Sequence, residues 1–389
     1  MENKVRSIAI YLPQFHPIPE NDEWWGKGFT EWTNVTKAQP LFKGHYQPQL
    51  PTESGLYDLR VPEVREQQAR LASEYGIYGF CYYHYWFNEK RILERPFQEV
   101  FESGEPSLPF MLCWANENWT RTWDGKENNV LLEQNYSEED YRKHIQHLIP
   151  FFRDERYIKI DGRPVIAIYK TQKIPNIDRL ISIWREEARG EGLELYLCRF
   201  ETDDTNKKEF AKGFDAAIEF QPHGGIANYV DKFWIDRMRR NKELTFENLL
   251  ISLRYRINKL LKAKGLVIDY KKFIRVVNAF KPEKGYKRFR GVSPGFDNTA
   301  RKRKNYFILK NSTPEVFGGW VNDAVTEFEA YSKEENLFFI NAWNEWAEGN
   351  HLEPCIKWGR AYLEALKENL EKAGGELKPS PSVREKILQ

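Results

Sequence analysis

Short runs of apolar, β-branched and aromatic residues recur along the whole chain, as is typical of buried strands. Eight such runs lie at residues 7–12, 78–83, 110–114, 165–169, 193–199, 216–220, 288–292 and 337–343. Stretches with the apolar spacing of amphipathic helices separate most of them, at residues 61–75, 138–152, 177–189, 315–333 and 359–373. A strand–helix alternation repeated about eight times predicts an α/β fold of the (β/α)8 TIM barrel type rather than an open sheet.

The alternation continues almost to the C-terminus of the 389-residue chain. We therefore predict one domain over residues 1–375 and a tail at 376–389. Residues 13–55 form a connection rich in Pro and Trp that is too long for an idle loop, so we expect it to fold over the mouth of the barrel.

A second departure from the alternation is an insertion at about residues 228–286, between the sixth and seventh strands. Apolar residues at helical spacing between Phe246 and Leu261 predict a helix with one apolar face. Residues 254–310 contain 18 Lys and Arg against three acidic residues. Such a stretch is a solvated surface, a peripheral contact with an anionic membrane, or a contact with a phosphate-bearing donor. No nucleic-acid-binding module accompanies it, which argues against nucleic acid as a partner.

The most informative segment is residues 338–349, FFINAWNEWAEG. An apolar run carries Glu345, Glu348, Asn344 and two Trp to the C-terminal end of the last predicted strand, where parallel α/β barrels place their chemistry. If the chain turns helically there, residues three apart face the same side. Paired carboxylates at short separation suit glycosyl chemistry with retention, so Glu345 and Glu348 are our candidate catalytic residues. The alternative is an acidic start of a helix, exposed to solvent.

Composition adds to this picture. The chain contains 13 Trp, 20 Tyr and 25 Phe, and many of them stand beside polar residues. This mixture indicates a cleft lined by aromatic and polar side chains more than a purely apolar core. The formal net charge of +2 indicates that the molecule as a whole does not bind polyelectrolytes through its net charge. The four Cys are scattered, and no apolar signal sequence or membrane-spanning run is evident. We therefore predict that the thiols are buried and reduced and that the protein is cytoplasmic. The basic insertion suggests an alternative, in which the protein contacts the inner membrane peripherally.

Further candidate site residues are polar or aromatic groups near predicted strand ends and in the long N-terminal connection. We expect no metal site and no cofactor, because the chain has no metal-ligand spacing, P-loop or GxGxxG. The alternative for each candidate is a structural role, as a capping group or a satisfied core residue. The candidate substrate-binding residues are Tyr11, Gln14, His16, Glu31, Trp32, Tyr83, His84, Trp86, Trp114, Asn116, Asn118, Trp119, Tyr169, Glu219, Gln221, Asp297, Arg301, Trp343, Asn344 and Trp346.

Five blocks of sequence, in order, resemble a known family. They are IYLPQFHP (10–17), GFTEWTNV (28–35), GFCYYHYWF (79–87), WANENW (114–119) and WNEWAEG (343–349). Together they resemble the WbsX-type proteins of bacterial surface-polysaccharide clusters, over about residues 6–370. That family is described as glycosyltransferases and is considered similar in fold to glycoside hydrolase family 99, whose members are retaining endo-acting barrel enzymes.

The resemblance to family 99 is narrower, because it depends on the barrel and on residues 344–349. It implies that Glu345 assists the substrate 2-hydroxyl in forming a 1,2-anhydro sugar, and that Glu348 is the general acid and base. The mannose specificity of family 99 is not carried over.

Three functions are consistent with these residues. The first is a glycan-active enzyme that transfers a glycosyl group in the biosynthesis of bacterial surface polysaccharide (O-antigen, lipopolysaccharide or capsule). The second is a retaining endo-glycosidase that acts on such polymers, and the third is a catalytically silent glycan-binding scaffold. The partner in each case is an oligosaccharide or polysaccharide, free or lipid-linked.

Overall fold

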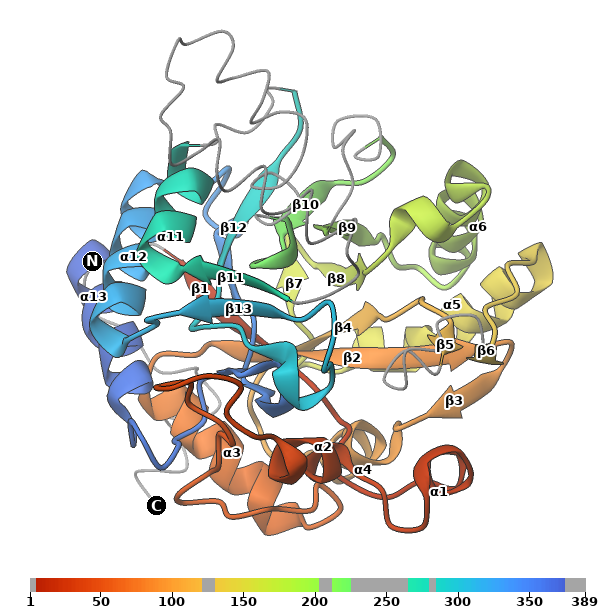
Figure 1. The fold of residues 1–389 in the computed structure, drawn as a ribbon. Coiled ribbons are helices and arrows are strands. Elements are labelled where there is room, and N and C mark those ends of the chain that lie inside the picture. Colours follow the sequence, from red (N-terminus) through yellow and green to blue (C-terminus); the bar gives the residue numbers. More distant parts are fainter. Residues whose placement is uncertain (1–4, 121–129, 203–211, 225–264, 280–284, 375–389) are drawn as a thin grey trace, which may run out of the picture.

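The computed structural model describes residues 5–120, 130–202, 212–224, 265–279 and 285–374, and its centre is a closed parallel barrel (Figure 1). Each barrel strand pairs in parallel with the next, and β1 pairs with both β2 and β14, which closes the ring. All eight predicted strands are present. The barrel strands are β1 (Arg6–Tyr11), β2 (Gly79–Phe87), β4 (Phe110–Trp114), β8 (Arg163–Ile168), β9 (Tyr196–Glu201), β10 (Ala216–Glu219), β12 (Arg288–Val292) and β14 (Leu337–Ile340).

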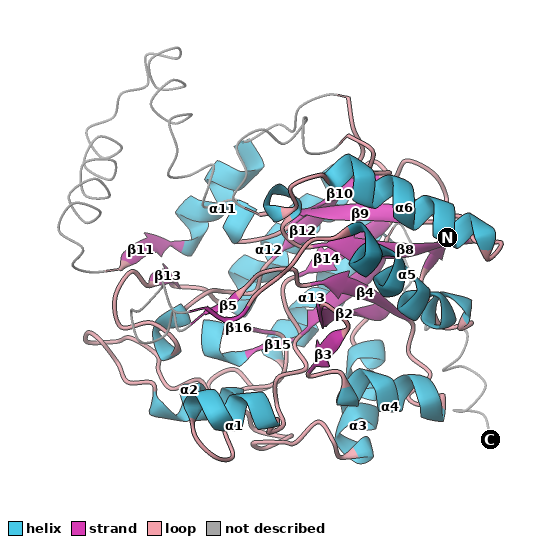
Figure 2. Cartoon of the chain, turned by 90° about the vertical axis from the view of Figure 1, so that its right-hand side faces the viewer, coloured by secondary structure: helices cyan, strands magenta, loops and turns pink. Residues whose placement is uncertain are grey.

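Helices surround the strands, which confirms the predicted TIM barrel (Figure 2). The five predicted helices correspond to α3 (Pro62–Glu74), α5 (Glu138–Arg153), α6 (Ile177–Gly190), α12 (Pro314–Glu327) and α13 (Ala361–Gly374). A further helix, α4 (Arg95–Ser103), was not predicted. In α5 the residues Tyr141, Ile145, Leu148 and Phe152 are buried at helical spacing, so one face packs on the barrel.

Short strands and single-turn helices lie in the connections between the barrel strands and helices. The strands are β3 (Lys90–Ile92), β5 (Trp119–Thr120), β6 (Val130–Leu132), β7 (Lys159–Ile160), β11 (Leu266–Asp269), β13 (Phe307–Lys310), β15 (Asn344–Glu345) and β16 (Asn350–His351). Single-turn helices are η2 (Thr171–Lys173), η3 (Asn298–Ala300) and η4 (Trp346–Glu348). The four Cys are buried and free, at positions 81, 113, 198 and 355.

The long N-terminal connection contains α1 (Pro19–Trp25) and α2 (Glu31–Lys37). The Trp32 ring of α2 lies 5.7 Å from the Trp346 ring of η4, and Glu31 forms an ion pair with Arg301. Helix α2 therefore packs beside the segment that carries the candidate catalytic residues, at the end of the barrel where the connection was expected.

Only the C-terminal part of the predicted insertion falls within the described residues. There β11 pairs in parallel with β13, and α11 (Tyr270–Ala279) follows it. The rings of Tyr270 and Phe273 lie 6.0 and 6.1 Å from the Trp320 ring of α12, so α11 packs against the body of the protein. The predicted amphipathic helix between Phe246 and Leu261 and the tail at 376–389 lie outside the described residues.

Candidate active site

A cleft with a volume of about 420 Å³ lies at the C-terminal end of the barrel. Side chains that follow most of the barrel strands converge on it. They include Leu12 and Gln14 after β1, Tyr83 and Tyr85 of β2, Asn118 and Trp119 after β4, Tyr169 and Lys170 after β8, Phe220 and His223 after β10, Arg301 after β12, and Glu345 and Glu348 after β14.

Glu345 and Glu348 share a single cation in this cleft. The Arg301 guanidinium contacts Glu345 through Nη2 at 3.0 Å and Glu348 through Nη1 at 2.7 Å. The third nitrogen, Nε, contacts Glu31 at 2.7 Å. Three carboxylates therefore surround one guanidinium, which leaves two excess negative charges if all three are ionised.

Burial makes this excess charge costly. The Glu345 side chain is 8% exposed, and desolvation raises the pKa of its carboxyl above the usual value. Arg301 opposes this rise, whereas the carboxylates of Glu348 and Glu31 add to it. Glu345 therefore holds its proton to a higher pH than an ordinary glutamate does, as suits a group that exchanges a proton near neutral pH.

Local backbone structure fixes the position of both glutamates. Strand β14 ends at Ile340, three residues earlier than predicted, but Trp343 N still donates to Ile10 O of β1 at 2.8 Å, and the Asn344 side chain continues the contact just beyond β1. Asn344 Oδ1 accepts a hydrogen bond from Leu12 N at 2.8 Å, and its Nδ2 donates to Leu12 O at 3.0 Å. Glu345 precedes η4 and Glu348 ends it, so the i and i+3 positions of this tight turn present both side chains to the same cleft.

Gly349 ends the turn in the left-handed conformation, with φ of 54°. A Cβ at this position would lie 2.6 Å from Gln49 Nε2 and 3.0 Å from Asp297 Cβ, so a side chain has neither the conformation nor the room. Asp297 N donates to Glu348 O, which ties the turn to the loop that carries Arg301.

Below the turn lies a fourth acidic group, Glu353, that our sequence analysis missed. It accepts hydrogen bonds from Tyr57 Oη, Gln68 Nε2 and Trp346 Nε1, each at 2.7 Å. Burial raises the pKa of Glu353 to about 7. Its partners come from distant parts of the chain, so no local pattern marks it. The network fixes Trp346, whose ring stacks on His351 at 3.7 Å.

Aromatic rings form the walls of the cleft. Tyr83, Trp119 and Tyr169 line it as predicted, and Tyr85, which was not predicted, lines it beside them. Trp119 is half-buried and its ring lies 5.6 Å from that of Tyr85, edge to face. Such half-exposed rings offer flat apolar surfaces on which sugar rings can stack.

Polar groups complete the lining. The amide of Gln14 is 95% buried, and its Nε2 has no hydrogen-bond partner among the described residues. Because a buried donor without a partner is costly, this amide is suited to a hydroxyl of a bound ligand. Asn118 is exposed at the cleft and accepts a hydrogen bond from Gln134 N at 2.8 Å.

Three predicted site residues pack between the barrel and its helices instead. Trp86 stacks on His144 of α5 at 4.7 Å and donates to Asp140, while His84 lies 5.1 Å from the His144 ring. Trp114 is fully buried and its ring lies 4.8 Å from that of His144. Burial lowers the pKa of His84 to about 3. This cluster faces away from the cleft.

Several other predicted residues are buried outside the cleft lining. Asn116 bridges two strand ends through Lys170 N and O, and Tyr11 donates to Gln68. Glu219 forms ion pairs with Arg288 and Arg290, and Asp297 contacts His45 Nε2 at 2.6 Å. The remaining residues of this group are His16, whose pKa burial lowers to about 4, Glu31, Trp32, Gln221, Trp343, Asn344 and Trp346. Of these, Glu31 reaches the site through Arg301, and Asn344 and Trp346 support the turn.

The described residues contain no group of three or more His, Cys, Asp or Glu that could hold a metal ion. Nor does any helix among them combine the length and the apolar composition needed to cross a bilayer.

Solved structures that share the fold include the following two. The GH99 endo-α-mannosidase from Bacteroides thetaiotaomicron has a TM-score of 0.53 at 13% identity and covers 94% of this chain and 97% of its own. A glycoside hydrolase-like protein has a TM-score of 0.55 at 14% identity and covers 95% and 94%.

Closer relatives are found by sequence. The protein WxcX of Xanthomonas campestris pv. campestris, in each of two strains, is 38% identical over 371 residues, which is 94% of this chain and 50% of the relative. The chain thus spans about half the length of these curated relatives. The family model described as glycosyltransferase WbsX matches residues 7–366. The chain therefore belongs to the glycosyltransferase WbsX family, which supports a glycan-processing role.

Proposed function

We propose that this protein transfers a glycosyl group through Glu345 and Glu348 in the assembly of a bacterial surface polysaccharide. The observation that carries the proposal is the pair of carboxylates in the cleft, held 3.0 and 2.7 Å from the same guanidinium of Arg301. Two acidic groups at fixed positions, one of them with a raised pKa, are what glycosyl transfer with retention requires.

The reaction follows from the roles that the resemblance to family 99 implies. Glu345 takes the proton of the substrate 2-hydroxyl, and the freed oxygen attacks C1 while the bond to the leaving oxygen breaks. Glu348 gives its proton to that leaving oxygen. A hydroxyl of the acceptor then gives its proton to Glu348 and attacks C1, the 1,2-anhydro bond opens, and Glu345 returns its proton to the 2-oxygen. Two inversions at C1 give net retention.

Arg301 holds both carboxylates in place during these steps. Because its guanidinium offers donors in a rigid fork, it can keep contact with Glu31 while charge moves between Glu345 and Glu348. Glu31 is fully buried and does not line the cleft, so it anchors the guanidinium from within the protein. We assign Arg301 and Glu31 as positioning residues.

Two lysines of the cleft support transfer over hydrolysis. Lys302 and Lys170 line it beside Arg301, whose three nitrogens already contact carboxylates, and the ammonium groups of lysines can receive the phosphate of an activated sugar donor. A lipid-linked or nucleotide-linked sugar carries such a phosphate. The alternative is a retaining endo-glycosidase with water as acceptor, which the fold shared with the endo-α-mannosidase favours.

Incubation of the purified protein with a nucleotide-sugar, a lipid-linked oligosaccharide and a free polysaccharide, in separate reactions, tests the proposal. Mass spectrometry of the products distinguishes the outcomes. Transfer predicts a longer oligosaccharide, whereas an endo-glycosidase produces shorter fragments from the free polymer. Absence of both products while the glycan binds would identify a silent scaffold and contradict the proposal.

A further inference from the structure

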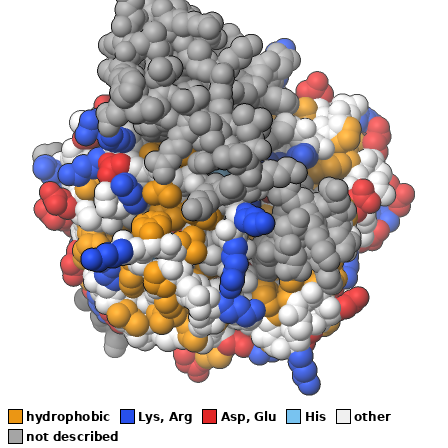
Figure 3. Space-filling view, viewed as in Figure 1, with side chains coloured by type: hydrophobic (Ala, Val, Ile, Leu, Met, Phe, Trp, Pro, Cys, Tyr) orange, Lys and Arg blue, Asp and Glu red, His pale blue; other side chains and the backbone are white. Residues whose placement is uncertain are grey.

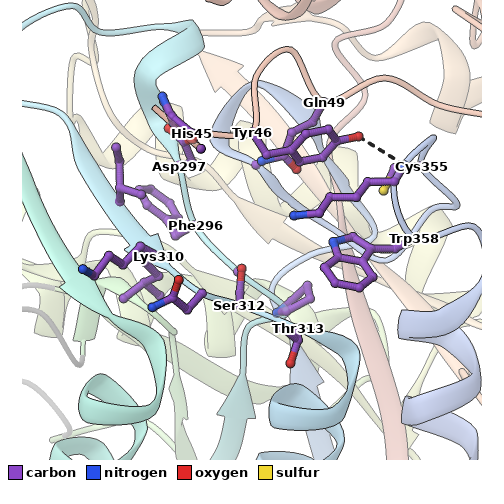
Figure 4. A pocket seen from close by; sticks show the side chains of 18 of the residues that line it. His45, Tyr46, Gln49, Phe296, Asp297, Lys310, Ser312, Thr313, Cys355 and Trp358 are labelled. Carbon is purple, nitrogen blue, oxygen red and sulfur yellow. Dashed lines mark hydrogen bonds and ion pairs between the residues drawn. The ribbon is translucent and has the colours of Figure 1, made fainter. Parts of the chain in front are cut away.

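A second and larger pocket, of about 600 Å³, is lined in part by Gly349, the residue after Glu348. Figure 4 shows this pocket from close by. Its walls come from the N-terminal connection, the loop after β12, strand β13 and the segment before α13. It shares no lining residue with the catalytic cleft, although Gly349 and Asp297, which line it, adjoin Glu348 through the chain and through a backbone hydrogen bond. The two pockets therefore lie on opposite sides of one turn.

One ammonium group of this pocket, that of Lys357, lies against two aromatic rings. Lys357 Nζ lies 4.9 Å from the centre of the Tyr46 ring and 4.7 Å from that of Trp358. Trp358 is half-buried, so part of its face remains open for a ligand. Figure 3 shows hydrophobic side chains interspersed with Lys and Arg on the face of the molecule that carries β13.

The charge of the lining is strongly unbalanced. Lys43, Lys310 and Lys357 line the pocket, and none of them forms a salt bridge with a described residue. The one acidic residue of the lining, Asp297, is engaged by His45 Nε2 at 2.6 Å and by Thr299 Oγ1 at 2.6 Å. The net positive charge is therefore left for an anion.

Neutral polar groups are present as well. Gln49, Ser312 and Thr313 line the pocket, and Thr313 is the N-cap of α12. The positive end of that helix dipole adds to the field of the three lysines. Amides and hydroxyls beside an open indole face suit the hydroxyls and the apolar face of a sugar ring.

We propose that this pocket is a second glycan-binding site, which takes a sugar carrying a carboxylate or a phosphate. Trp358 stacks on the sugar ring, and Lys310 and Lys357 bind the anionic group. The inference does not depend on the reaction proposed for Glu345 and Glu348.

Isothermal titration calorimetry on the full chain with four probes tests this proposal. Trigalacturonate carries carboxylates on sugars, glucose 1-phosphate carries a phosphate on a sugar, maltotriose is a neutral sugar, and inorganic phosphate is an anion without a sugar. We expect at least one of the two acidic sugars to bind about ten-fold more tightly than maltotriose and than inorganic phosphate, and increasingly weakly as salt is added. The acidic sugar that binds more tightly identifies the anionic group.

Variants place the binding within the molecule. Lys310→Glu and Trp358→Ala should each weaken the acidic sugar about five-fold or more, whereas Lys304→Glu, an exposed lysine outside both pockets, should not. Trp358→Phe should restore most of the affinity. Any one of three results would overturn the proposal: maltotriose binding as tightly as both acidic sugars, no binding of either acidic sugar, or binding that is lost in Glu348→Gln but kept in Lys310→Glu.

Discussion

The two pockets on either side of residues 345–351 differ more in charge than in size. The cleft that holds the candidate catalytic residues is lined by three acidic residues, Glu117, Glu345 and Glu348, and by three basic ones. The second pocket has three lysines and a single carboxylate that is already engaged. Both are lined by half-buried aromatic rings, so both offer surfaces for a sugar.

The difference matches the two roles that we propose, chemistry in the cleft and binding in the second pocket. Proton transfer needs acidic groups whose pKa is moved by burial and by neighbouring charge, and the cleft supplies them around Arg301. Binding of an anionic sugar needs only a complementary charge and a surface, which the second pocket supplies. If this view is correct, substitutions in the two pockets should affect different measurements.

The largest effect is expected from Arg301→Met. Removal of the guanidinium leaves Glu31, Glu345 and Glu348 without their common partner, and an unpaired buried charge costs about 3–5 kcal/mol. We expect the free energy of unfolding to fall by that order and turnover to be lost. Urea denaturation of this variant and of Arg303→Met, an exposed arginine two residues away, checks the prediction. Equal stability of the two variants would show that Arg301 does not hold the carboxylates.

Two tryptophan substitutions distinguish the pockets by ligand. Trp119→Ala should weaken binding of the glycosyl donor or acceptor by about 1–3 kcal/mol, because it removes one aromatic surface of the cleft. Trp358→Ala should leave that binding within about 0.5 kcal/mol, because the ring lines only the second pocket. Calorimetric titration of both variants with the same glycan measures the difference. Equal losses would mean that the two pockets bind one continuous glycan.

The buried carboxyls of Glu353 and Glu345 should make the stability of the protein depend on pH. Glu353 has a pKa of about 7 in the folded chain against 4.5 as its ordinary value, so the folded state binds its proton more tightly. This contribution to stability is fully present below pH 4.5 and is lost as the pH rises towards 7. The raised pKa of Glu345 acts in the same direction. Burial lowers the pKa of His16 and His84, and these residues act in the opposite direction. The test is therefore the comparison of Glu353→Gln with the unmodified protein: between pH 4.5 and 7 the free energy of unfolding of the variant should fall less, or rise more. The same pH dependence in both proteins would contradict the assignment.

The smallest effect is expected from Glu117→Gln. This carboxylate lines the same cleft as Glu345 and Glu348, but its side chain is exposed and no described contact joins it to Arg301. We expect turnover to change by less than about ten-fold, since an exposed carboxylate contributes little. Steady-state kinetics measure this change. If Glu117→Gln lost as much turnover as Glu345→Gln or Glu348→Gln, the acid–base role would have to be assigned to Glu117, which follows β4.

Much of the barrel could be predicted from the sequence because each strand is a buried apolar run and each helix has one apolar face. Residues 337–343 also predicted correctly where β14 lies, although the strand ends earlier, at Ile340, and the contact with the first strand region continues through Trp343 N and the Asn344 side chain. These contacts join residues from opposite ends of the chain, and no local sequence pattern indicates them.

The aromatic site residues were harder to predict, for a reason visible in β2. Side chains alternate between the two faces of a strand, so Tyr83 and Tyr85 line the cleft while His84 and Trp86 face α5. Both faces of the strand end carry aromatic side chains, two Tyr on one and His and Trp on the other, and the sequence does not reveal which pair lines the cleft. The same ambiguity explains Trp114, which packs against His144 and Trp184 instead of lining the cleft.

The turnover of Glu345→Gln and Glu348→Gln on the glycan donor, with Glu117→Gln as the matched control, shows whether these two glutamates perform the chemistry. We predict that each of the first two substitutions lowers turnover by about 10²–10⁴-fold while the dissociation constant for the glycan stays largely unchanged. Turnover within about ten-fold of the unmodified protein in either variant would contradict this role.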